Sequence, residues 1–172
     1  GLDMIEYLAK NGGIEIETFA HGALCMSFSG SCLYSSMAGE RSGNRGTCAQ
    51  PCRKRASVSG RPGRHDYCLS PNDICMLSEL DKLKKAGVSC VKIEGRMKKP
   101  EYVATVTRCY RAALDGADAR GIEKMRGELF ELFNRGSFST SHLYGDSVRT
   151  DREASSKPGR ELVRLAENSV KN

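Results

Sequence analysis

The chain has 172 residues, of which 39% are hydrophobic and 28% charged, a composition that suits one domain with a buried core. No apolar stretch approaches the roughly 18 residues that a transmembrane helix needs, so we predict no membrane span. The net charge of +6 is uneven, because seven basic residues and no acidic one lie between Arg41 and Arg64. Such a segment is either a solvated loop or a surface for phosphate, nucleic acid or another anion.

The two termini and the cysteine content indicate in which cellular compartment the protein functions. The chain opens on Gly1 without a signal peptide and closes on a helix-like run, so we expect a piece of a longer protein. Its eight cysteines accompany many Lys, Arg and Glu residues. In a reducing compartment a cysteine cluster indicates metal binding or catalysis more often than disulfides. We therefore predict a cytoplasmic protein.

A helix and a strand are the first predicted elements. Residues 3–10 carry apolar side chains at helical spacing, and the Asn-Gly-Gly run at 11–13 ends the helix. Residues 14–20 then alternate apolar and polar side chains, as a half-buried strand does. Residues 22–67 lack apolar periodicity and are rich in Gly, Ser, Cys and Arg. A loop of this length needs a reason, and a metal site would give one.

A second helix is predicted to begin near residue 70. Ser70-Pro71 has the form of a helix N-terminus, because Ser caps backbone N–H groups and Pro suits the first turn. Apolar residues then recur at every third position, and Ala86-Gly87 ends the pattern. Asp73 would lie in the first helical turn, where a carboxylate favours the helix dipole, so we expect a structural role for it.

The second half of the chain continues the alternation of elements. Residues 88–93 predict a short buried strand, Pro100 opens a helix that ends near Gly116, and a further helix reaches Phe133. Strands that alternate with helices predict an α/β fold with parallel strands.

The first four cysteines share the irregular segment. Their spacing, C-x6-C-x15-C-x3-C, contains none of the CxxC knuckles typical of structural zinc, which weighs against zinc without excluding it. Thiolates also suit iron–sulfur clusters, which take four of them, and a cubane cluster accepts ligands gathered from a longer loop. The predicted ligands are Cys25, Cys32, Cys48 and Cys52.

The remaining cysteines have a plainer interpretation. Free cysteine is often buried as a small hydrophobe, and we expect this for Cys109 in a helix and for Cys90 beside a strand. Cys68 or Cys75 in place of one of the four predicted ligands stays an open alternative.

Several separate motifs occur in the order of one known family. The longer ones are ETFAHGALC at 17–25, NRGTCAQPCR at 44–53 and VKIEGRMK at 91–98, and the shorter ones are SGSC at 29–32, LSPND at 69–73, EYV at 101–103 and FNRG at 133–136. Together they resemble peptidase family U32, the collagenase-like proteases, over about residues 14–145.

This resemblance implies a partial TIM-like barrel, its second half, over residues 1–145, with an iron–sulfur loop at 22–67 and a linker with the start of a following region at 146–172. It also implies a 4Fe–4S cluster on the four predicted ligands. Better-studied members of the family take part in hydroxylating tRNA, ribosomal RNA or a quinone precursor, with prephenate as the hydroxyl source for RNA. RNA hydroxylation is therefore the expected function.

The family name makes proteolysis the alternative function. The sequence contains neither the HExxH motif of zinc peptidases nor the GxSxG elbow of serine hydrolases. A nucleophilic pair of His21 and Cys25 is conceivable, but the cysteine is better used as a ligand. A third interpretation is a non-catalytic fragment whose cysteine loop organises a partner interface.

Charged residues alternate at the end of the second predicted strand. In α/β barrels the C-terminal ends of strands carry the chemistry. Lys92 and Glu94 are expected to form a buried ion pair or part of a structural salt-bridge network, and Arg96 to hold a carboxylate or phosphate. The candidate catalytic residues are His21, Lys92, Glu94 and Arg96. The candidate RNA-binding residues are Arg53, Lys54 and Arg55.

Overall fold

The computed structural model describes residues 1–28, 30–57, 65–132 and 134–145. Its helices are α1 (Leu2–Asn11), α2 (Tyr34–Gly39), α3 (Leu80–Lys85), α4 (Pro100–Leu114), α5 (Ala119–Glu131) and α6 (Ser141–Tyr144). Its strands are β1 (Glu17–Gly22), β2 (Ala56–Ser57), β3 (His65–Asp66), β4 (Asp73–Cys75), β5 (Cys90–Ile93) and β6 (Phe138–Ser139). Short 3-10 turns occupy η1 (Gly43–Arg45), η2 (Pro51–Arg53) and η3 (Leu77–Glu79).

Four strands form one mixed sheet in the order β5-β1-β4-β6. The β1–β5 and β4–β6 pairs are parallel, whereas β1 and β4 run antiparallel, with His21 opposite Cys75. The α/β class is confirmed, and the two strands predicted from the sequence, β1 and β5, are parallel as expected. The antiparallel pair involves β4, a strand that had not been predicted. Within the described residues the sheet is open, with β5 and β6 at its edges, so the partial TIM-like barrel stays a prediction.

The helix predicted from Ser70 begins later than the sequence pattern indicated. Residues 73–75 form β4, and α3 begins at Leu80. The polar side chains before β4 are engaged in tertiary contacts instead of capping a helix. Ser70 accepts a hydrogen bond from Arg53, and Asn72 donates one to the Arg135 carbonyl. These long-range contacts outweigh the local capping preference.

The later helices follow the sequence pattern closely. Pro100 opens α4, and the Asp118 side chain caps α5 by accepting from the Gly121 backbone N–H at 2.8 Å. Phe133, expected in the last turn of this helix, lies outside the described residues. The two-residue β6 and the single-turn α6 had not been predicted, because such short elements carry too little periodicity to be recognised.

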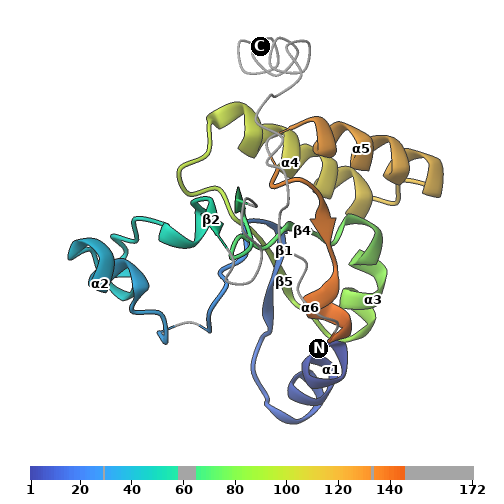
Figure 1. Cartoon of the computed structure of the whole chain (residues 1–172). Helices are drawn as coiled ribbons and strands as arrows, with labels where there is room; N and C mark the ends of the chain where they lie inside the picture. The colour runs from blue at the N-terminus through green and yellow to red at the C-terminus, as the bar shows by residue number, and fades with distance from the viewer. Residues whose placement is uncertain (29, 58–64, 133, 146–172) are drawn as a thin grey trace.

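The hydrophobic core lies between the sheet and helices α3, α4 and α5, which gather on one side of it in Figure 1. Its buried apolar side chains are Ala20, Ile74, Cys75, Met76, Leu77, Leu80, Leu83, Tyr102, Val106, Cys109, Tyr110, Met125, Leu129, Leu132 and Leu143. On the opposite side of β1, Phe19 is 48% exposed. The apolar face of the sheet therefore packs against the helices, and the other face of β1 is partly exposed to solvent.

A register irregularity in β1 brings His21 into this core. The pairing of β1 with β5 shifts between Phe19 and His21. Successive side chains of a regular strand point to opposite faces, yet Ala20 and His21 are both buried, at 0% and 1% exposure. A bulge of this kind redirects a side chain, and here it places the imidazole against α4.

Residues 23–57, here named the cysteine lobe, extend from the end of β1 and lie to one side of the sheet in Figure 1. This segment was predicted to be irregular, and the structure adds α2, η1, η2 and β2 to it. β2 pairs with β3 as a separate two-stranded ribbon. Among the described residues of the lobe none belongs to the buried core, although Leu24 packs against it.

Candidate metal centre

The four predicted ligands are spread along the cysteine lobe. Cys25 follows β1, Cys32 precedes α2, Cys48 follows η1 and Cys52 lies within η2. All four thiols are free, with Cys25 and Cys48 exposed and Cys32 and Cys52 partly buried. Free and accessible thiols of this kind are available as ligands.

Cys25 and Cys48 lie within electrostatic range of the Cys52 thiol. Burial raises the pKa of the Cys52 thiol most, the Arg53 guanidinium opposes the rise, and the nearby Cys25 and Cys48 thiols add to it. Like charges that interact in this way lie in one neighbourhood. The fold therefore brings Cys25, which lies far from Cys52 in the sequence, into electrostatic range of Cys52 and its sequence neighbour Cys48.

Helix α2 is tied to the segment that bears Cys48. The buried Ser35 side chain of α2 accepts a hydrogen bond from the Ala49 backbone N–H at 2.8 Å. The Gln50 backbone N–H, in a left-handed conformation with φ 54°, donates to the Cys48 sulfur at 3.3 Å. An N–H group that faces a thiolate is the kind of donor that stabilises sulfur ligands of a cluster.

Arg96 attaches the lobe to the end of β5. Its Nη2 donates to the Gly46 carbonyl at 2.5 Å, and Gly46 adopts a positive φ of 77° close to the guanidinium. The side chain that was expected to hold a carboxylate or phosphate is thus engaged with the backbone beside Cys48.

The donor set fits an iron–sulfur cluster in its chemistry. Soft thiolates, an N–H donor to sulfur and the neighbouring Arg53 cation all suit a negatively charged cluster. Within the described ranges, no group of three or more His, Cys, Asp or Glu side chains is arranged to hold a single metal ion. A cubane cluster with separate iron corners needs its thiolates farther apart than one ion does.

The buried Asp73 and two partly buried cations, Lys98 and Arg135, form a cluster beside the lobe that is here named the buried charge group. Asp73 is 1% exposed and forms an ion pair with Arg135 at 2.6 Å. Lys98 lies over the Tyr102 ring at 4.7 Å, and burial lowers the pKa of its ammonium to about 8, with Asp73 opposing the shift. Arg53 interacts electrostatically with both Asp73 and Arg135, so this buried charge group reaches the cysteines.

The sequence interpretation had placed Asp73 in a helix and had given Lys98 and Arg135 no role. Asp73 lies instead in β4, where its carboxylate meets a cation 62 positions later in the chain. Within the described residues, Asp73 Oδ2 and the Tyr102 hydroxyl are buried without a hydrogen-bond partner. The motifs at 91–98 and 133–136 were the available signal, because each contains one of these cations.

His21 lies deep in the core beside aromatic rings. Its Nδ1 is 3.4 Å from the Tyr110 hydroxyl, and its ring makes edge contacts with Tyr110 and Phe138 at centroid distances of 5.5 and 5.4 Å. Burial, and then the Lys98 charge, lower the pKa of the imidazole to about 4. His21 is therefore neutral at physiological pH.

The expected pairing of Lys92 with Glu94 is wrong. Lys92 forms an ion pair with Glu17 at 3.1 Å, with both side chains about half exposed. Glu94 accepts instead from the Arg96 backbone N–H at 2.7 Å. Strand pairing explains this, because the parallel register sets Glu17 opposite Cys90 and Phe19 opposite Lys92, so Glu17 is a diagonal neighbour of Lys92.

The remaining cysteines divide between core and surface. Cys109 is fully buried, as expected, whereas Cys90 is exposed, and its expected burial is wrong. Cys75 is 4% exposed within the core, and Cys68 is partly buried.

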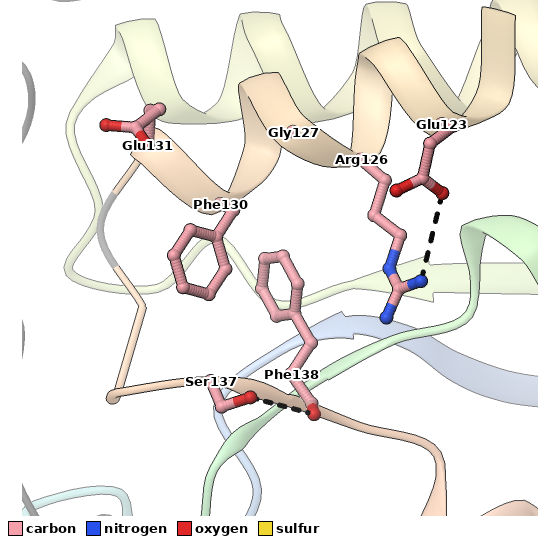
Figure 2. Close-up of a pocket in the computed structure, with 7 residues that line it drawn as sticks. All are labelled: Glu123, Arg126, Gly127, Phe130, Glu131, Ser137 and Phe138. Atoms are coloured by element: carbon pink, nitrogen blue, oxygen red, sulfur yellow. Dashed lines mark hydrogen bonds and ion pairs between the residues drawn. The ribbon is translucent and has the colours of Figure 1, made fainter. Parts of the chain in front are cut away.

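A separate open pocket lies between α5 and β6, as Figure 2 shows. Its volume is about 320 Å³. Arg126 and Glu123 lie at one end, and Phe130 and Phe138 meet edge to face at the other. None of the predicted site residues lines it.

The described residues thus form an open, mixed α/β sheet with a lobe that bears four free cysteines, and the class of protein is α/β. The family model described as peptidase family U32 matches residues 1–153, and the chain belongs to this family. The predicted family is thereby confirmed. No solved structure matches the chain. No helix in the described part of the chain is long and apolar enough to cross a membrane.

The relatives that are similar to this chain carry names of different activities. A collagenase of Porphyromonas gingivalis is 39% identical over 78% of the chain and 35% of its own length. The 23S rRNA 5-hydroxycytidine synthase of Escherichia coli is 39% identical over 86% of the chain and 22% of its own length. The tRNA hydroxylation protein P of Escherichia coli is 30% identical over 77% of the chain and 42% of its own length. The chain thus spans less than half of each relative.

Proposed function

We propose that this chain is the cluster-binding part of an RNA-hydroxylation protein, with a 4Fe–4S cluster on Cys25, Cys32, Cys48 and Cys52. The observation that carries the proposal is the hydrogen bond from Arg53, the neighbour of Cys52, to the carbonyl of Leu24, the neighbour of Cys25. Cys48 also lies within electrostatic range of Cys52. Relatives named for hydroxylation of tRNA and for synthesis of hydroxycytidine in 23S rRNA support RNA as the substrate.

The chain's own residues supply the setting for this chemistry. When bound, the cluster supplies an exchangeable electron. The four cysteines would hold it, and Arg96 fixes the lobe against the end of β5 through the Gly46 carbonyl. The proposed location is cytoplasmic, as suits thiols that are free.

A carboxylate-bearing co-substrate fits the buried charge group, and the family resemblance suggests prephenate. Arg53, Lys98 and Arg135 surround Asp73 with positive charge. The buried Tyr102 hydroxyl and Asp73 Oδ2, which lack hydrogen-bond partners within the described residues, are available to a polar ligand.

RNA contact is assigned to the exposed members of the basic segment. Lys54 is exposed, and Arg55 is exposed with its guanidinium 5.6 Å from the centroid of the Tyr67 ring. Arg53 points inward, to Leu24, Ser70 and Pro71. We therefore propose that Lys54 and Arg55 bind RNA phosphates. The Arg53 side chain is instead engaged in hydrogen bonds within the protein.

The test is complementation of a strain that lacks the complete protein. Nucleosides from its tRNA and ribosomal RNA are analysed by mass spectrometry. We expect the wild-type protein to restore a hydroxylated nucleoside and the Cys48→Ala variant to restore none. Equal restoration by both proteins would refute a role for the cluster in hydroxylation.

Relatives named collagenase support proteolysis as a second candidate. A thiol peptidase needs a base beside its nucleophile. The His21 ring is buried against Tyr110, whereas Cys25 is exposed, so the geometry does not favour this pair.

Proteolysis is tested on the complete protein with its cluster intact. We expect no cleavage of gelatin or unstructured peptides above a mock-purified control. Cleavage that is lost in His21→Ala and retained after iron removal would establish the peptidase instead.

A further inference from the structure

The side chain of Arg53 joins three separate parts of the chain. Nη2 donates to the Leu24 carbonyl, and Nη1 donates to the Ser70 hydroxyl at 2.8 Å and to the Pro71 carbonyl at 3.0 Å. Leu24 immediately precedes Cys25, and Arg53 immediately follows Cys52. One guanidinium therefore links the segments that bear two predicted ligands to the loop before β4.

The position of Arg53 is itself fixed by the backbone. It ends the η2 turn, where its N–H donates to the Gln50 carbonyl at 2.9 Å. It lies within electrostatic range of the Cys52 and Cys25 thiols and of Asp73. The guanidinium is thus held between the cysteines and the buried charge group.

Only a guanidinium satisfies these three acceptors together. Arg presents five N–H donors in a rigid planar fork, whereas the Lys ammonium is a point charge on a flexible stem. The Leu24 acceptor lies at the start of the lobe and the Ser70 and Pro71 acceptors lie in the loop before β4, so the rigid fork sets the separation of these two segments.

We infer that Arg53 is a positioning residue that holds the Cys25 and Cys52 segments at the separation a cluster requires. This inference rests on the proposed cluster site, and it assigns to Arg53 a role distinct from RNA contact. Groups that orient metal ligands from outside the ligand set typically account for roughly 10- to 100-fold in metal affinity.

The first experiment compares Arg53→Lys, Arg53→Met and Arg45→Met in the complete protein, reconstituted anaerobically with iron and sulfide. Arg45 is an exposed arginine of the same lobe and serves as the matched control. We expect both Arg53 variants to bind the cluster about 10- to 100-fold more weakly and Arg45→Met to match wild type. Wild-type loading of Arg53→Lys would show that charge alone suffices and would overturn the inference.

The second experiment measures alkylation of each cysteine in the metal-free protein by mass spectrometry. We expect Cys25 and Cys52 to react severalfold faster in both Arg53 variants, while Cys90 reacts at the wild-type rate. Unchanged urea midpoints for the core would show that the fold is retained. Wild-type alkylation rates in Arg53→Met would overturn the positioning role.

The two experiments separate this inference from the proposed function. If the wild-type protein takes up no cluster, the cluster proposal fails. The alkylation rates then decide by themselves whether Arg53 holds the two cysteine segments.

Discussion

At the scale of single residues, the four cysteines of the lobe lead to a direct prediction. Replacing Cys25, Cys32, Cys48 or Cys52 by Ala should remove most bound iron, because each cluster corner needs its thiolate. Iron and sulfide per chain are measured after anaerobic reconstitution.

Cys90→Ala and Cys109→Ala are the controls for this series, one exposed and one buried. Both should keep the iron content of the wild-type protein. Equal iron content in all the variants would refute the ligand assignment.

The buried imidazole of His21 predicts a dependence of stability on pH. Its pKa is lowered to about 4, against about 6.5 in an unfolded chain. As the pH falls from about 6.5 towards 4, the unfolded chain takes up a proton that the folded chain does not. The free energy of unfolding should therefore decrease, by up to about 3 kcal/mol.

Urea unfolding at a series of pH values measures this loss. His21→Phe keeps an aromatic ring and should remove the His21 contribution, whereas His142→Gln, at an exposed position, should keep it. Identical pH profiles for wild type and His21→Phe would contradict the assignment.

At the scale of elements, the ion pair between Asp73 and Arg135 holds β4 to the segment that leads into β6. Removing one partner deprives the other of its direct ion pair at a site that is largely shielded from water. Asp73→Asn or Arg135→Met should therefore lower the free energy of unfolding by about 3 kcal/mol.

The pair of Arg111 and Asp115 on α4 offers a matched comparison at the same distance of 2.6 Å, with both side chains 62% exposed. Asp115→Asn should cost less than about 1 kcal/mol. Similar losses of unfolding free energy in the two pairs would show that burial does not explain the strength of the Asp73–Arg135 ion pair.

At the scale of the whole molecule, the chain spans less than half the length of the relatives that it matches. The described sheet ends at β5 and β6, and the relatives that match this chain are more than twice its length. RNA binding is accordingly measured on the complete protein.

The proposed RNA contact predicts a change in salt dependence. The logarithm of affinity for a single-stranded RNA should fall with the logarithm of salt, at about 0.7 per phosphate neutralised. Lys54→Gln with Arg55→Gln should flatten that slope by about 1 to 2. Lys84→Gln with Lys85→Gln, exposed on α3, is the control and should leave the slope unchanged. If the Lys54→Gln with Arg55→Gln variant keeps the wild-type salt slope, these two side chains do not contact RNA phosphates.

The sequence by itself determined the family, because several separate motifs resemble those of the family and occur in its order. The helices α4 and α5 and the strand β1 were predictable because apolar periodicity and helix ends are local signals. The sequence also identified the cysteine segment as irregular, since that segment lacks periodic apolar residues.

Only the tertiary structure decided that residues 73–75 form a strand, that β1 and β4 run antiparallel, and that Lys92 pairs with Glu17. The same is true of the contact between Arg53 and Leu24, which lie 29 positions apart. These features depend on which distant segments meet, and local propensity is too weak to specify that when buried charges and strand partners compete with it.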